Sequence, residues 1–343
     1  MTLPTDDETL AAARAGDGSA FEALVAPHRR SVLAHCYRMM ASSADAEDAA
    51  QEATIRAWKH LAGYEGRASL RGWLHAIATR VCLDHLAQRA TRRVPSFDEV
   101  GPASPTEPPG APVLDPVWLE PMADARWCDG PLDAAEGPEA RCTRRESVGM
   151  AFLAAIQVLP ASQRAALLLH EVAGWEAAEI AATLDLSVAA VNSALQRARK
   201  ALDERAPRWN RRPAVPAAAE VDALTRYLRA WEAGDAGALA AALREDAALA
   251  MPPVPSWYAG RDAVVGFYRD FVLPMVGAVR MARVGSVNGE PALASYKRDA
   301  AGVWRADALH VVTVSEAGEV ARVVAFLGGD AVVACGGAAV LVG

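Results

Sequence analysis

The chain has 343 residues, of which 52% are hydrophobic and 22% are charged, so it is long and apolar enough to build more than one packed core. No apolar run is long enough to cross a bilayer, and the N-terminal residues lack the basic and apolar pattern of a signal peptide. Five scattered cysteines form no C-x-x-C pair, which excludes zinc sites of the usual spacing. We therefore expect a cytoplasmic protein without a metal or other cofactor.

The net charge of −7 does not by itself exclude a nucleic-acid partner, because the charge is unevenly distributed. Residues 95–147 alone carry a net charge of −7, whereas residues 1–94 carry +1 and residues 148–213 carry +2. The distribution of charge along the chain therefore matters more than the total.

A first helical domain is predicted over residues 7–94. Within it, residues 45–61 place alanines, Trp58 and Leu61 on one apolar stripe. Acidic side chains and one amide gather at the front of this helix: Asp45, Glu47, Asp48, Gln51 and Glu52. Helix physics alone explains the carboxylates, since the first turn of a helix favours negative charge. The functional alternative is a docking surface for a basic partner.

A further helix is predicted over residues 69–93. Its inward face is expected to consist of Leu70, Trp73, Leu74, Ile77 and Val81. Arginines accumulate toward its C-terminal end. This pattern fits either a core helix with a solvated basic end or a helix that contacts nucleic acid.

Residues 95–147 form an acidic linker that is rich in proline and has no sustained helical or strand period. Such a composition fits a solvated tether. Four large apolar residues argue against a tether alone: Trp118, Leu119, Trp127 and Leu132. We therefore expect part of this linker to dock onto the C-terminal domain.

A second helical domain is predicted over residues 148–206. A short helix near residues 177–184, a tight turn and a longer helix over residues 187–202 are arranged as in a helix-turn-helix. Val191, Leu195, Ala198 and Leu202 share the inner face of the longer helix. A helical hairpin within an ordinary bundle would give the same pattern.

Residues 217–330 have a different pattern. One amphipathic helix stops at Gly234, and runs typical of strands follow beyond Val279. Asn288-Gly289 lies between two such runs, which is a strong signal for a β-hairpin. The sequence thus predicts a multidomain protein: two all-α domains, the linker, and an α+β domain with an antiparallel meander. Residues 331–343 are a tail that either adds a strand or packs on the linker.

The chain resembles bacterial extracytoplasmic-function (ECF) RNA polymerase sigma factors in three segments that occur in the same order: DAEDAAQEATIRAW, SLRGWLHAIATRVCLDHL and LPASQRAALLLHEVAGWEAAEIAATLDLSVAAVNSALQRARKAL. This resemblance covers about residues 7–205. The segment MPPVPSWYAGRDAVVGFY, residues 251–268, resembles the SnoaL-like domain, a cone-shaped relative of ketosteroid isomerase. The WLEP motif at residues 118–121, together with this C-terminal domain, is similar to a subgroup of these factors that carries such a fusion.

The resemblance implies a factor that binds core RNA polymerase and promoter DNA and directs transcription initiation. It implies that the acidic helix front docks on the β′ clamp of the polymerase, and that the linker threads the channel later taken by nascent RNA. It places eight residues near the minus-ten promoter element: Arg67, Arg71, Arg80, His85, Gln88, Arg89, Arg92 and Arg93. It places seven at the minus-thirty-five element: Ser187, Ala190, Asn192, Ser193, Gln196, Arg197 and Lys200.

The longer helix of the helix-turn-helix departs from the family pattern Gly-Thr-Val-Lys-Ser-Arg. Residues 189–194 read Ala-Ala-Val-Asn-Ser-Ala, so the Lys and Arg positions hold Asn192 and Ala194. We expect Asn192 or Gln196 to read adenine and Lys200 to contact phosphate. The loss of two cations predicts a minus-thirty-five preference distinct from that of common family members.

Three roles are open for the C-terminal domain. A pocket for a small-molecule ligand would involve Trp257, Tyr258, Asp307 and His310. Catalysis would need a positioned general base and an oxyanion partner, which one His and one Asp do not establish, so we expect no enzyme. The resemblance favours an intramolecular regulator that packs on the sigma domains.

The competing interpretation of the whole chain is a ligand-responsive helix-turn-helix regulator that acts without binding polymerase. The acidic helix front and the helix over residues 69–93, where the family unstacks promoter DNA and captures a base, favour the sigma factor, because a simple repressor needs neither. No membrane partner is expected.

Overall fold

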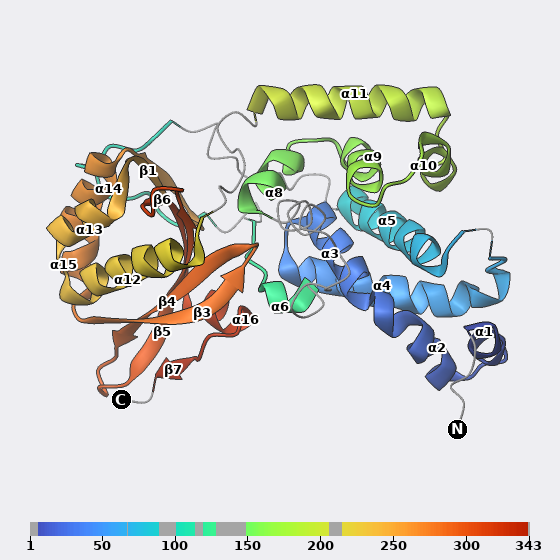
Figure 1. The fold of residues 1–343 in the computed structure, drawn as a ribbon, viewed down its shortest axis with the longest axis horizontal. Helices are drawn as coiled ribbons and strands as arrows, with labels where there is room; N and C mark the ends of the chain where they lie inside the picture. The colour runs from blue at the N-terminus through green and yellow to red at the C-terminus, as the bar shows by residue number, and fades with distance from the viewer. Residues whose placement is uncertain are drawn as a thin grey trace. The chain divides into compact units, whose positions relative to one another are not determined.

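The structure is a computed structural model that describes residues 6–66, 68–88, 101–113, 119–127, 149–205 and 215–341. These residues divide into two compact units (Figure 1). The first contains the described residues up to Gln88 and those from Ala125 to Arg205, and the second contains residues 101–124 and 215–341. Each unit is described by itself.

The N-terminal part of the first unit is helical, as predicted. Its described α-helices are α1 (Asp6–Arg14), α2 (Gly18–Val25), α3 (Arg29–Met40), α4 (Ser43–His60) and α5 (Leu70–Gln88), with short 3-10 turns at Ala26–His28 and Leu61–Gly63. Side chains define where two of them begin: Asp17 accepts hydrogen bonds from the backbone N–H groups of Ser19 and Ala20, and Ser42 accepts one from Asp45.

Helix α4 packs through a stripe of small residues. Ala46, Ala49, Ala53 and Ala57 are buried at intervals of three and four residues, which allows close contact with its neighbours α3 and α5. Trp58 was predicted on this stripe, but 38% of its surface is exposed, and its ring contacts Phe21 edge-to-face at 4.9 Å. The buried stripe of α4 is centred on these four alanines, and Trp58 lies at the margin of the stripe.

Helix α5 buries Leu74 and Val81 as predicted, whereas Leu70, Trp73 and Ile77 are only half-buried. Polar residues take part of the inner face instead. The imidazole of His35 in α3 lies 2.8 Å from the Thr79 hydroxyl, and His75 is also buried. Burial lowers the pKa of both imidazoles, to about 4 for His75, so both are neutral at pH 7.

The second part of the first unit contains α6 (Asp124–Trp127), α8 (Met150–Gln157), α9 (Ala161–Glu171), α10 (Ala177–Leu184) and α11 (Val188–Arg205). Asp185 between α10 and α11 adopts a left-handed conformation with φ of 54°, which closes the tight turn of a helix-turn-helix. Ala166, Leu169, Ile180, Val191 and Leu195 form its core. The predicted helix-turn-helix is therefore present.

Arg164 of α9 connects the two helical parts of the first unit. Its buried guanidinium donates hydrogen bonds to the backbone carbonyls of Ile156, Gln157 and Leu159, and to that of Met39 in α3. Burial lowers its pKa to about 10, so the group remains charged at pH 7. Carbonyls at the C-terminal end of α3 are suitable partners for a cation, because the helix dipole makes that end negative.

The second unit combines helices with one mixed sheet (Figure 1). The helices are α12 (Ala217–Ala233), α13 (Ala236–Ala242), α14 (Arg261–Phe267) and α15 (Leu273–Val276), with a π-helical turn at Tyr268–Val272 and the short α16 (Gly329–Ala334). The strands are β1 (Leu243–Met251), β2 (Val254–Ala259), β3 (Val279–Val287), β4 (Glu290–Arg298), β5 (Trp304–Val314), β6 (Val320–Leu327) and β7 (Val340–Leu341). The sheet order is β2-β1-β6-β5-β4-β3, and β7 pairs with β5.

The α+β class and the hairpin at Asn288-Gly289 are confirmed. Both residues have positive φ, of 53° and 75°, as a tight hairpin turn requires. The antiparallel meander predicted beyond Val279 is present as β3, β4, β5 and β6. Strand β1, which the sequence did not predict, pairs with β6 in parallel. The tail both adds a strand, β7, and forms α16.

No single helix of the described residues is long and apolar enough to span a membrane. Helices α10 and α11 reach that length and apolarity only when taken together, and they are bent by 103° relative to one another.

Candidate nucleic-acid and protein interfaces

The five polar residues at the front of α4 differ in what they contact. Asp48 and Gln51 are exposed, while Asp45 is half-buried in the first turn. Glu47 forms an ion pair with Arg126 of α6. The structure therefore places the predicted acidic surface on one helix, with Asp48 and Gln51 as its most accessible members.

Glu52 is held by two intramolecular partners. Its carboxylate lies 2.7 Å from the His85 imidazole of α5 and also pairs with Arg56 one turn along α4. Hydrogen bonds from His85 and Arg56 lower the pKa of Glu52. Sequence reasoning gave Glu52 to the polymerase surface and His85 to the DNA surface, and the structure brings the two into direct contact.

The exposed side of α4 continues beyond the acidic front as an apolar strip. Ile55 is 47% exposed and Trp58 is 38% exposed. They follow Asp48 and Gln51 at helical spacing, so all four share one side of the helix. The sequence analysis did not single out Ile55, although its position seven residues after Asp48 would have indicated it.

The minus-ten candidates lie on and after α5. Arg71, Arg80 and Gln88 are exposed, and His85 is half-buried. Arg67, Arg89, Arg92 and Arg93 lie outside the described residues. Tyr64, which precedes the helix, packs against Trp73 of α5 with ring centroids 5.0 Å apart, so two aromatic rings lie together at the start of α5.

Arg80 contacts the turn of the helix-turn-helix. Its Nε donates a hydrogen bond to the Thr183 carbonyl at 3.1 Å, and its guanidinium lies 3.6 Å from the Asp185 carboxylate. Both side chains of this ion pair are more than half exposed. Exposed pairs contribute about 0–1 kcal/mol, so Arg80 is weakly held and is exchangeable for a stronger anionic partner.

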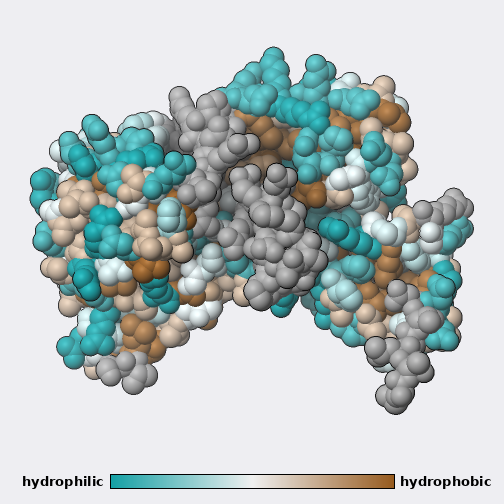
Figure 2. Space-filling view, viewed as in Figure 1, coloured by the Kyte–Doolittle hydropathy of each residue, from teal (hydrophilic) through white to brown (hydrophobic). Residues whose placement is uncertain are grey.

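Helix α11 presents a hydrophilic outer surface (Figure 2). Its exposed minus-thirty-five candidates are Asn192, Ser193, Gln196, Arg197 and Lys200. Ala190 is half-buried, and the Ser187 hydroxyl accepts a hydrogen bond from the Ala190 N–H at 3.1 Å. Ser187 therefore caps the helix, as its place at the front of this helix in the sequence predicts.

Ala194 corrects part of the sequence interpretation. It was treated as a position where a DNA-contacting cation had been lost. Its side chain is 5% exposed and belongs to the core of the helix-turn-helix. A small residue at position 194 therefore reflects packing in this chain, and Asn192 is the exposed member of the pair.

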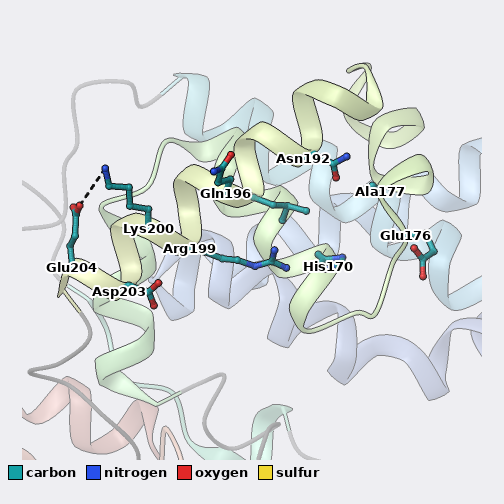
Figure 3. Close-up of a pocket in the computed structure, with 10 residues that line it drawn as sticks. His170, Glu176, Ala177, Asn192, Gln196, Arg199, Lys200, Asp203 and Glu204 are labelled. Carbon is teal, nitrogen blue, oxygen red and sulfur yellow. Dashed lines mark ion pairs between the residues drawn. The ribbon is translucent and has the colours of Figure 1, made fainter.

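A hollow of about 750 Å³ runs beside α11 (Figure 3). Asn192, Gln196 and Lys200 line it, together with residues of α9 and α10. Arg199 also lines it, and the Glu171 carboxylate accepts two of its hydrogen bonds, at 3.0 and 2.6 Å. Lys200 lies 3.9 Å from Glu204, a distance that leaves its ammonium available to another anion.

The linker packs on the second unit, as the sequence analysis expected. The Ala103 N–H donates to the Trp257 carbonyl at 2.7 Å, and the Val113 N–H donates to the Pro253 carbonyl at 2.9 Å. Trp257 lies in β2, the edge strand of the sheet, and Pro253 directly precedes that strand. Trp118 and Leu132 lie outside the described residues.

A second linker contact involves the turn between β3 and β4. The Met122 N–H donates to the Asn288 side-chain oxygen, and the Asn288 N–H donates to the Met122 carbonyl, both at 3.0 Å. The Gly289 N–H donates to the Asp124 carboxylate at 2.8 Å. Leu119 and Met122 are buried. The linker is thus hydrogen-bonded to the Asn288-Gly289 turn, which the sequence had identified only as a hairpin signal.

The interior of the second unit contains a chain of polar aromatic groups. The Tyr227 hydroxyl lies 3.1 Å from His310 Nδ1 and 3.3 Å from the Tyr268 hydroxyl, and His310 Nε2 lies 3.4 Å from the Ser295 hydroxyl. Burial lowers the pKa of His310 to about 4 and raises that of Tyr227 to about 12. All these groups are neutral at pH 7.

The four residues of the predicted ligand pocket each have a different partner. Tyr258 is buried and stacks on Phe267 with centroids 4.2 Å apart, and its hydroxyl has no hydrogen-bond partner among the described residues. Asp307 pairs with Lys297 at 2.9 Å, while His310 bonds to Tyr227. Trp257 is half-buried on β2, beneath the linker contact described above.

Family models match three parts of the chain. Sigma-70 region 2 matches residues 24–93, Sigma-70 region 4 matches residues 149–202, and the SnoaL-like domain matches residues 224–323. Regions 2 and 4 contain the helices that carry the polymerase and DNA candidates. The SnoaL-like match covers the second unit from α12 to β6.

Two relatives and one solved structure are similar over long stretches. The ECF RNA polymerase sigma factor SigG of Mycobacterium tuberculosis is 41% identical over 319 residues, which are 92% of this chain and 82% of SigG. The RNA polymerase sigma-H factor of Pseudomonas aeruginosa is 30% identical over 206 residues, 60% of this chain and 95% of that protein. The crystal structure of M. tuberculosis SigJ, an extracytoplasmic function sigma factor, matches with a TM-score of 0.53 at 24% identity over 92% of this chain and 98% of SigJ, which supports the fold.

Proposed function

We propose, from the premise that this chain belongs to the ECF RNA polymerase sigma factors, that its SnoaL-like domain regulates it in cis by holding the linker. The chain is a sigma factor that binds core RNA polymerase and directs promoter recognition and transcription initiation. What the SnoaL-like domain contributes is the proposed part.

The observation that carries the proposal is the reciprocal pair of hydrogen bonds between Met122 and Asn288. Two backbone groups of the linker are satisfied by one residue of the hairpin turn, as if the linker added a short strand. Each such bond contributes on the order of 1 kcal/mol, and the buried side chains of Leu119 and Met122 add to it. Together these contacts hold the linker on the second unit.

Within the first unit, Arg126 of α6 contacts the predicted polymerase surface of region 2. Its guanidinium forms an ion pair with Glu47 of α4. Glu47 is one of the five residues that we assign to polymerase binding, together with Asp45, Asp48, Gln51 and Glu52. We infer that this ion pair neutralises one carboxylate of the docking surface in the free chain.

The DNA contacts are assigned to two surfaces. For the minus-ten element we assign Arg71, Arg80, His85 and Gln88, with Arg67, Arg89, Arg92 and Arg93 beyond the described residues. For the minus-thirty-five element we assign α11 through Ser187, Ala190, Asn192, Ser193, Gln196, Arg197 and Lys200. The exposure of Asn192, Gln196 and Lys200 along one helix supports base and phosphate contacts by these side chains.

We infer that the SnoaL-like domain has no catalytic function. His310, its buried imidazole, is bonded to Tyr227 and Ser295, and the Asp307 carboxylate is paired with Lys297. A general base must reach a substrate proton, and these partners occupy both groups. A ligand pocket near Trp257 and Tyr258 stays a prediction, as do the domain boundaries at residues 94, 147, 206 and 330. A sigma factor acts at the chromosome, so we place the protein in the cytoplasm.

The variant Asn288→Gly tests the proposal. Glycine keeps the positive φ of the turn but removes the side-chain oxygen that accepts the Met122 N–H. We expect severalfold more promoter-dependent transcript from Asn288→Gly than from the wild type at limiting core polymerase. Asn288→Asp is the matched control, because it keeps an acceptor oxygen and tolerates the turn, and it should resemble the wild type. Equal transcript from all three proteins would rule out regulation through this contact.

A further inference from the structure

An apolar tip lies at the beginning of α11. Val188 is the first residue of the helix and 46% of its surface is exposed, and Leu186 in the preceding turn is 39% exposed. The residue between them, Ser187, uses its hydroxyl to cap the helix. Leu186 and Val188 thus place two exposed aliphatic side chains on either side of a serine whose hydroxyl already accepts a hydrogen bond.

Val188 begins a row along the exposed side of the helix. Val188, Asn192, Gln196 and Lys200 are four residues apart and all exposed, so consecutive members of this row are neighbours that wind slowly around the helix, by about 40° per step. Figure 3 shows Asn192, Gln196 and Lys200 in this order along α11. The row therefore runs from an apolar group through two amides to one cation.

The chemistry of this row matches one kind of base sequence. The N-terminal residues of a recognition helix in the major groove meet base edges, and later cations meet phosphates. Asn and Gln pair with adenine through two hydrogen bonds. An aliphatic side chain offers no hydrogen bond, and in the major groove the matching apolar group is the 5-methyl group of thymine.

We propose that Val188, flanked by Leu186, contacts the 5-methyl group of a thymine in the minus-thirty-five element and thereby determines specificity at that base pair. DNA is the occupant that the structure favours, because Val188 is continuous with the exposed row of a helix that belongs to a DNA-binding region. The inference rests on the assignment of α11 as the recognition helix. It adds a contact that neither Ser187 nor Ala190 provides.

Deoxyuridine substitution tests the contact directly, because deoxyuridine pairs like thymine but lacks the methyl group. Holoenzyme made from core polymerase and the full chain selects a promoter duplex from a randomised pool. Each thymine of the selected minus-thirty-five element is then replaced singly by deoxyuridine, on either strand. At one or two positions we expect wild-type holoenzyme to bind roughly threefold to fivefold more weakly, the size of one buried methyl group.

The variant Val188→Ala should show no penalty from deoxyuridine at those positions and should bind the thymine duplex with the lower affinity. Alanine is a better helix former than valine and Val188 is exposed, so the fold is not at risk. Val221→Ala, at an exposed valine of α12 (49%), is the matched control and should behave as the wild type.

Two results would overturn the inference: wild-type holoenzyme that is indifferent to every deoxyuridine, or a Val188→Ala variant that keeps the full penalty. Lys200→Ala separates this failure from that of the underlying assignment. If Lys200→Ala weakens binding while the deoxyuridine effects are absent, α11 reads DNA without Val188. If Lys200→Ala has no effect, α11 is not the recognition helix and both proposals fail.

Discussion

His310 shows how a single residue gives the SnoaL-like domain a dependence on pH. The imidazole is buried, and its pKa is about 4 in the folded chain against about 6.5 in an unfolded one. Because the pKa of the imidazole is lower in the folded chain, the unfolded chain takes up this proton at a higher pH than the folded chain does. Stability is therefore unaffected above pH 6.5 and decreases between pH 6.5 and 4.

The expected loss between pH 7.5 and 5.5 is about 1.4 kcal/mol from His310 alone. Calorimetric unfolding of the wild type and of His310→Gln at both pH values measures it. Glutamine can still hydrogen-bond to Tyr227 but does not titrate. The unfolding temperature of the SnoaL-like domain should therefore fall less on acidification in His310→Gln than in the wild type. An identical shift in both proteins would show that His310 is not the titrating group. The neighbours Tyr227 and Tyr268 do not interfere, because burial raises their pKa values.

At the residue scale, the sequence identified candidate functional residues better than it identified the side chains that contact them. It identified Glu52 and His85 as functional residues, yet their 2.7 Å contact depends on how α4 packs against α5. It placed Asp307 and His310 in one pocket, whereas in the structure Asp307 pairs with Lys297 and His310 with Tyr227. Side-chain pairing between elements depends on register and packing, which a local pattern does not contain.

At the scale of the element, α11 separates two kinds of DNA contact. Asn192 is an exposed amide near the start of the helix, and Lys200 is an exposed cation about two turns after Asn192. We expect Asn192→Ala to change which promoter sequences are bound, by roughly 1–3 kcal/mol for the base pair it reads. We expect Lys200→Ala to weaken binding to all promoters alike and to reduce the salt dependence of binding.

Binding of both variants to a panel of minus-thirty-five sequences, at several salt concentrations, measures these effects. Ser193→Ala is a useful reference on the same exposed side. If Asn192→Ala and Lys200→Ala lower affinity equally for every sequence, the division between base reading and phosphate binding is wrong.

Elements with a strong period or a strong turn were predicted well. The bounds of α10 and the hairpin of β3 and β4 agree with the sequence, because a left-handed Asp185 and an Asn-Gly pair mark their turns locally. Strand β1 was missed, since LREDAALAM is rich in alanine and has an acidic pair that is equally typical of a helix. Its strand conformation follows from pairing with β2, which comes directly after it, and with β6, which lies far from it in the sequence.

At the scale of the whole molecule, the linker is the segment for which sequence and structure agree most usefully. Its acidic composition fitted a tether, and its large apolar residues argued for docking. The structure buries Leu119 and Met122 and bonds Met122 to Asn288. The sequence could not identify the acceptor, because the hairpin turn at Asn288 is 166 residues from Met122 along the chain.

The central claim is that linker docking on the SnoaL-like domain and binding of core polymerase exclude one another. Hydrogen exchange of the Met122 and Asn288 amides, measured in the free chain and in the holoenzyme, tests it most directly. Both N–H groups are hydrogen-bonded in the docked linker, so both should be protected in the free chain and lose protection in the holoenzyme. Amides between β4 and β5 should stay protected in both states. Protection of Met122 and Asn288 that persists unchanged in the holoenzyme would contradict the account.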